Sequence, residues 1–116
     1  LHKGIKPKDC IKLINVLQKE GLNYACISSG GILPKTNMRF YPGFRIHMAK
    51  LIKKKTKVLI RTSGLINDEK ILYSVLKNLD LVALGRKFIN NKYFLLKNKK
   101  FYNKLNIPDQ YYYCFN

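Results

Sequence analysis

The chain has 116 residues and a formal net charge of +17, with 23 lysines and arginines against six acidic residues. This length suffices for one modest hydrophobic core, and no apolar run approaches the roughly 20 residues that a membrane span requires. The charge alone would fit a nucleic-acid binder. The lysines are spread over every predicted element without base-reading groups, however, so we expect no specific nucleic-acid function.

Three widely separated cysteines and two histidines show no metal-ligand spacing, so we expect no metal site. Cys26 lies within a predicted strand, and we expect it to be a small buried apolar side chain rather than a reactive thiol. This cysteine usage and the lack of a signal peptide favour a reducing, cytoplasmic setting.

The first half of the chain predicts two helices with a strand between them. A helix over 9–20 ends at Gly21, a short buried strand follows over 24–28, and a loop over 32–42 contains two prolines. The next helix is expected over 44–53. The apolar sides of the two helices are expected to be buried, with Ile11, Ile14 and Leu17 in the first and Ile46, Ala49, Leu51 and Ile52 in the second.

The second half repeats the alternation with a strand over 57–62, a helix capped by Asn67, and a strand over 79–84. This helix is expected to face the sheet with four apolar residues, Ile71, Leu72, Val75 and Leu76. Two short helical stretches are predicted over 87–90 and 93–103. From about residue 105 we expect an irregular aromatic tail. Repeated strand–helix units favour a parallel α/β sheet in a single domain over 1–116.

Two of the predicted strands end in a glycine: Ser63 and Gly64 follow one, and Gly85 and Arg86 follow the other. A glycine between a buried parallel strand and a helix lets backbone N–H groups approach a ligand closely. In (β/α)8 barrels, the loops after the last two strands form such a phosphate site. Arg86 adds a permanently charged fork suited to phosphate oxygens. The alternative is a tight turn without a ligand, with Arg86 as a solvated surface charge.

Four segments occur together in a fixed order: Ser-Ser-Gly-Gly at 28–31, Tyr-Pro-Gly-Phe at 41–44, Gly-Leu-Ile at 64–66 and Leu-Gly-Arg at 84–86. In these segments the chain resembles the C-terminal part of the Old Yellow Enzyme family, FMN-dependent enzymes that oxidise NAD(P)H, and within it the bacterial NADPH dehydrogenase-like branch. The resemblance implies a (β/α)8 TIM barrel, of which this chain contains about strands six to eight.

The resemblance also implies roles for individual residues. Backbone N–H groups of Gly64 and Gly85 would hold the FMN 5′-phosphate, Arg86 would add a charged contact, and Ser29 lies near the flavin. Relatives often have an apolar residue at the position of Ser63, so its hydroxyl is either an extra donor or has no role. The family's catalytic residues precede the sixth strand, so none maps onto this chain. Some relatives insert a tail arginine into the neighbouring subunit, but this chain has none after its Gln-Tyr pair at 110–111.

We therefore expect the chain to be the FMN-binding part of an NAD(P)H-dependent oxidoreductase of the ene-reductase type, whose substrate is an electron-poor alkene. Alone, the chain should be inactive. Because a complete barrel takes roughly 250 residues, we expect about 200 further residues upstream of Leu1. The aromatic tail could pack in a homo-oligomer. The alternatives are another phosphate-binding barrel, acting on a phosphorylated substrate, and a basic binding protein without catalysis.

Overall fold

The computed structural model describes residues 4–31, 38–97 and 108–110. The chain forms two compact units, Leu1–Leu84 and Gly85–Asn116, and each is described by itself. The expectation of a single domain stays a prediction.

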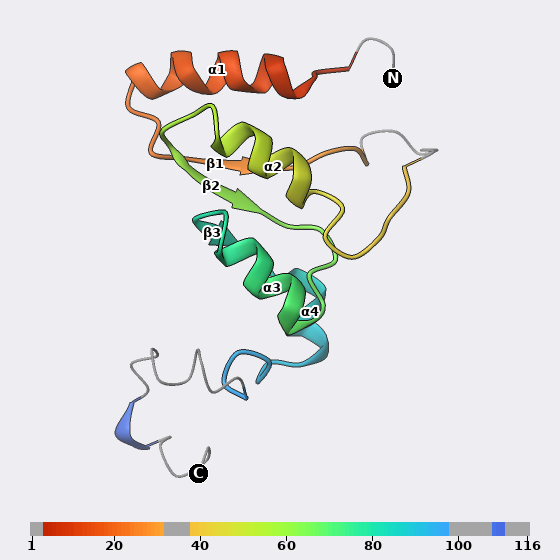
Figure 1. Cartoon of the computed structure of the whole chain (residues 1–116). Helices are drawn as coiled ribbons and strands as arrows, with labels where there is room; N and C mark the ends of the chain where they lie inside the picture. Colours follow the sequence, from red (N-terminus) through yellow and green to blue (C-terminus); the bar gives the residue numbers. More distant parts are fainter. Residues whose placement is uncertain (1–3, 32–37, 98–107, 111–116) are drawn as a thin grey trace. The chain divides into compact units, whose positions relative to one another are not determined.

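A three-stranded parallel sheet organises the first unit (Figure 1). Its strands are β1 (Tyr24–Ile27), β2 (Leu59–Thr62) and β3 (Leu81–Val82), and they lie side by side in the order of the sequence. The predicted parallel α/β arrangement is confirmed within this unit. Each strand is shorter than expected.

Three helices belong to the same unit: α1 (Pro7–Lys19), α2 (Ile46–Lys53) and α3 (Glu69–Leu76). α1 begins two residues earlier than predicted, because a proline is well tolerated in the first turn of a helix. α2 begins two residues later than predicted, because the chain up to Arg45 is occupied by a turn in which Gly43 adopts a φ of +76°. None of the described helices is long and apolar enough to cross a bilayer.

The core lies between the helices and one face of the sheet. Successive strand residues point to opposite faces, and on the helix-facing side Ile60 and Thr62 of the central strand are fully buried. Ala49 and Ile52 of α2 are buried as well, as predicted, together with Leu72 and Val75 of α3. The helix-covered face therefore holds most of the apolar contact in this unit.

The opposite face of the sheet is exposed in the described part of the chain. Tyr24 and Leu59 are paired in the register of β1 and β2, and their exposed fractions are 49% and 48%. We call this surface the open face; its residues are Tyr24, Cys26, Leu59, Arg61 and Leu81. The expectation that Cys26 is buried is wrong, because its side chain lies on the open face and is exposed.

Other differences from the predictions concern helix edges. Leu51 of α2 is 42% exposed and Leu76 of α3 is 36% exposed, so neither belongs to the core. Leu17 of α1 is also exposed, whereas Ile14 is buried as expected. These residues lie at the margins of the apolar stripes of their helices. The stripes are wider than the area of each helix that is buried, so the marginal residues stay exposed.

The second unit begins with α4 (Gly85–Asn90), so the predicted helix over 87–90 is confirmed and starts two residues earlier. Residues 92–97 form turns rather than the expected helix. The rest of that predicted helix lies outside the described residues. Of the predicted irregular tail, only residues 108–110 are described, and Asp109 and Gln110 lie in a 3₁₀ turn.

Candidate functional site at the carboxyl edge of the sheet

The carboxyl ends of β1 and β2 lie at the same edge of the sheet because the two strands are parallel and in register. Ser29 lies two residues beyond β1, and Ser63 follows β2 directly. In parallel α/β sheets, ligands bind outside this edge. Two of the predicted site residues are thus on neighbouring loops at the edge where a ligand is expected.

Arg45 joins these two loops. Its Nε donates to the Ser29 hydroxyl oxygen at 3.3 Å, its Nη2 to the Ser29 carbonyl oxygen at 2.7 Å, and its Nη1 to the Ser63 hydroxyl oxygen at 3.1 Å. The guanidinium carbon lies 4.6 Å from the centre of the Phe44 ring, within the range of a cation–π contact. The half-buried arginine is therefore held in one position by both its donors and its stacking surface.

Sequence reasoning missed Arg45. The residue immediately follows the Tyr-Pro-Gly-Phe segment and lies in the helix predicted over 44–53, and nothing in its spacing from either serine indicates a contact. The available signal was its place at the N-terminus of a helix that starts at the carboxyl edge of a parallel sheet, where loops converge.

The loop after β2 has an unusual backbone conformation. Gly64 adopts a φ of +125° and Leu65 a φ of +51°, the latter in a left-handed region that leucine rarely occupies. The Gly64 carbonyl oxygen accepts a hydrogen bond from the Gly43 N–H at 2.8 Å. At Leu65 this conformation costs about 1–3 kcal/mol, and backbone strain of this kind is concentrated at functional sites, so Leu65 marks this loop as part of a candidate site.

Gly64 also has a packing reason to be glycine. A Cβ at this position would lie 3.1 Å from the Phe44 ring and 3.4 Å from Cγ of Arg45. The turn conformation and this close approach explain why residue 64 is glycine even without a ligand. The alternative interpretation of Gly64 as a structural glycine therefore stays open.

Gly85 and Arg86 are the first two residues of α4, in the second unit, and both are exposed. Gly85 has no positive φ, and a Cβ built on it would meet nothing within 4 Å among the described residues. Neither backbone conformation nor packing therefore requires glycine here. The structure brings Ser29 and Ser63 together through Arg45, whereas Gly85 and Arg86 belong to the other unit.

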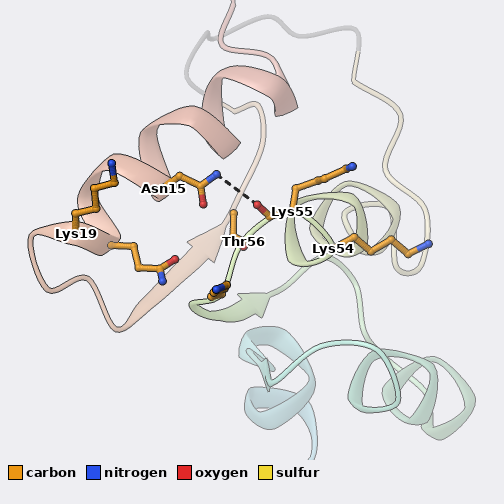
Figure 2. A pocket seen from close by; sticks show the side chains of 7 residues that line it. Asn15, Lys19, Lys54, Lys55 and Thr56 are labelled. Atoms are coloured by element: carbon orange, nitrogen blue, oxygen red, sulfur yellow. Dashed lines mark hydrogen bonds between the residues drawn. The ribbon is translucent and has the colours of Figure 1, made fainter.

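A concavity of about 520 Å³ lies elsewhere in this unit, between α1 and the segment that follows α2. Seven residues line it, namely Asn15, Gln18, Lys19, Lys54, Lys55, Thr56 and Lys57. Figure 2 shows the Lys19 ammonium beside α1 and the Lys54 and Lys55 ammonium groups pointing away from α1, so these three groups do not converge on a common point.

Three of the four lysines of this concavity have a structural explanation. Lys19 ends α1, and Lys54 and Lys55 follow the last turn of α2. Positive charge near a helix C-terminus is favourable because the helix dipole is negative there. The Asn15 amide also donates to the Lys55 carbonyl oxygen at 3.4 Å, and this hydrogen bond links α1 to the segment that follows α2. We therefore place the candidate site at the carboxyl edge of the sheet.

Within the described segments there is no group of three or more His, Cys, Asp or Glu side chains that could hold a metal ion. The groups present at the carboxyl edge are hydroxyls, a guanidinium and backbone amides. These are donors and positive charge, the chemistry that an anion requires.

No protein-family model matches the chain. The NADPH dehydrogenase of Clostridium acetobutylicum is 34% identical over 116 residues, which cover 97% of this chain and 34% of that protein. The NADPH dehydrogenase of a Geobacillus species is 28% identical over 94 residues, covering 79% of this chain and 27% of its own. The NADPH dehydrogenase of Geobacillus thermodenitrificans is 29% identical over 111 residues, which cover 93% of this chain and 32% of that protein. The chain is thus similar over most of its length to bacterial NADPH dehydrogenases, and it spans about a third of the length of these curated relatives.

Proposed function

We propose that this chain is the FMN-phosphate-binding part of an NADPH-dependent flavin oxidoreductase of the Old Yellow Enzyme type, built as a (β/α)8 barrel. Its similarity to bacterial NADPH dehydrogenases supports the reaction class. The parallel sheet with one open face supports a part of a barrel. The proposed substrate of the whole protein is an electron-poor alkene.

The residues at the carboxyl edge fit a phosphate monoester. Its oxygens need several N–H or O–H donors and nearby positive charge, and Ser29, Ser63 and Arg45 together supply both kinds of group. When FMN is bound, it supplies the hydride chemistry, accepting from NADPH and passing to the alkene. This chain's own residues bind and orient the phosphate. Gly85 and Arg86 are proposed to complete the phosphate site.

The observation that carries the proposal is the left-handed backbone of Leu65, in the loop that begins with Ser63 at the carboxyl edge of a sheet whose sequence is similar to NADPH dehydrogenases. Strain of this kind persists where the surrounding structure enforces it. A ligand that accepts hydrogen bonds from the backbone N–H groups of this loop would explain why the strained conformation is kept.

The test compares flavins with and without the phosphate, in the complete polypeptide that contains these residues. We expect Arg86→Ala to weaken FMN binding by about 1.5–3 kcal/mol, the scale of a hydrogen bond to a charged group. Riboflavin, which lacks the phosphate, should bind almost unchanged. Dissociation constants from flavin fluorescence titration measure both effects.

The matched control is Lys12→Gln, which removes one positive charge from the exposed side of α1. It should leave both affinities unchanged. An equal loss for FMN and riboflavin in Arg86→Ala would remove the phosphate assignment. Binding of a phosphorylated sugar in preference to FMN would instead favour a barrel that acts on a phosphorylated substrate.

A further inference from the structure

The hydrogen bonds of Arg45 determine how the two serine hydroxyls can be used. A serine hydroxyl has one donor and two acceptor lone pairs. Arg45 has no acceptor, so at Ser29 and at Ser63 it occupies a lone pair of the hydroxyl oxygen. Each hydroxyl keeps its proton to donate elsewhere.

The position of Arg45 is itself secured. Its strongest contact, from Nη2 to the Ser29 carbonyl oxygen, is 2.7 Å long, as is typical of charge-assisted bonds. The guanidinium carbon lies over the ring of Phe44, which packs edge-on against Phe40 with centroids 5.5 Å apart. A side chain with so many fixed contacts loses little further freedom when a ligand arrives.

Arg45 has no carboxylate partner among the described residues; the ion pair found there joins Lys53 and Asp80. Its positive charge is therefore not neutralised by an acid at this edge of the sheet. An uncompensated, half-buried cation beside two hydroxyl donors favours a ligand of negative charge.

We propose that Arg45 is a positioning residue that makes this edge selective for a phosphate monoester. It orients the hydroxyls of Ser29 and Ser63 as donors and supplies charge behind them. This inference rests on the proposed function, because it assigns Arg45 to the phosphate site of the flavin. It goes beyond that function by adding a residue outside the glycine loops and by linking the loops after β1 and β2 into one anion site.

The experiment measures FMN and riboflavin binding to the complete polypeptide with Arg45→Gln, Arg45→Lys and the control Lys12→Gln. Arg45→Gln should weaken FMN binding by about tenfold to a hundredfold, the range for a lost hydrogen bond to a charged group, because the released hydroxyls would no longer be held to donate to the phosphate. Riboflavin binding should change less than about twofold. Arg45→Lys keeps the charge but not the fork, and we expect an intermediate loss. Lys12→Gln should change neither affinity.

A double-mutant cycle with Ser63→Ala tests whether Arg45 acts through the serine. If it does, the losses of FMN affinity in Arg45→Gln and Ser63→Ala are not additive, because either change removes the same arrangement. Additive losses would show that Arg45 does not orient Ser63.

The outcomes separate this inference from the function on which it rests. If the wild type prefers FMN to riboflavin and Arg45→Gln keeps that preference, Arg45 has no role and the proposed function stands. If the wild type shows no preference for FMN, both fail. If Arg45→Gln does not fold, full FMN preference in Arg45→Lys still overturns the inference, because the fork geometry would then be dispensable.

Discussion

Asp80 connects α2 to the start of β3. Its carboxylate lies 2.7 Å from the Lys53 ammonium and accepts a hydrogen bond from the Ile60 N–H at 2.8 Å. Partial burial alone would raise the pKa of Asp80, but the Ile60 hydrogen bond and the Lys53 charge outweigh it, and the pKa lies below its ordinary value of 3.8. A carboxylate whose pKa is lowered by folding stabilises the folded state while it is charged.

We expect Asp80→Asn to lower the free energy of unfolding near pH 7 by about 1 kcal/mol, a modest figure because the pair is partly exposed. The stabilising contribution is complete above the unfolded pKa of 3.8 and is lost as the pH falls through the lower folded value. The difference between wild type and variant should therefore be constant above about pH 5 and shrink below about pH 3.8. Denaturant titrations across this range measure it.

The control for Asp80 is Glu20→Gln at the end of α1, because Glu20 is exposed and no ion pair involves it among the described residues. It should not show the same pH dependence. A stability difference for Asp80→Asn that persists undiminished at low pH would contradict the charge-based explanation.

At the scale of residues, sequence could indicate chemistry but not contacts. The strand-end serines and glycines were identifiable because their types and positions have a direct physical meaning. Arg45 was not, since its three hydrogen bonds span 16 and 18 positions and depend on how α2 is oriented. Cys26 was misjudged because alternation along a strand does not show which face will be covered.

α3 shows that a helix can be predicted correctly while its capping residue is missed by one position. The sequence Asn-Asp-Glu at 67–69 offers several capping residues, and Asn67 was the predicted cap. In the structure the cap is Asp68, whose carboxylate accepts from the Ile71 N–H at 2.8 Å. The helix itself was predictable from its apolar spacing, whereas the choice between adjacent caps depends on the extended backbone at Asp68.

We expect Asp68→Ala to destabilise the protein by about 1 kcal/mol, because it leaves a helix N–H without its acceptor and removes negative charge from the positive end of the helix. Asn67→Ala is the matched control and should have little effect. Equilibrium denaturation of both variants measures the difference. Equal losses in the two would show that the cap is shared or lies at Asn67.

At the scale of the whole molecule, the main feature is the open face, which no described element of the first unit covers. All-parallel sheets are normally covered on both faces, yet Leu59, which begins the central strand, is about half exposed on this face. Arg61 adds a second sign, because its Nε is shielded from solvent without a hydrogen-bond partner among the described residues. An unpaired buried donor is costly, so an element that covers this face would need to supply an acceptor.

The parallel α/β class was predictable from the alternation of strands and helices, and the similarity to bacterial NADPH dehydrogenases agrees with the resemblance inferred from four short segments. A barrel, by contrast, cannot be read from three strands. Closure depends on strand number and stagger, and neither is contained in residues 24–84. For the same reason, the arrangement of Gly85 and Arg86 with the loops after β1 and β2 stays a prediction.

The open face makes a prediction about the 116-residue chain expressed alone. Exposed strand edges and exposed apolar side chains on a sheet face promote association, so the chain should be oligomeric or poorly soluble despite its charge of +17. Because repulsion between like charges opposes association and is screened by salt, the oligomers should grow as ionic strength rises. Leu59→Ser should reduce association, while Leu13→Ser, at an exposed position on α1, should not. Light scattering after gel filtration distinguishes these variants.

The chain alone should also fail to oxidise NADPH with FMN and an enone, since phosphate binding is the only role proposed for it. A monomer with a sharp cooperative melt and measurable turnover would show instead that this sheet needs no covering element.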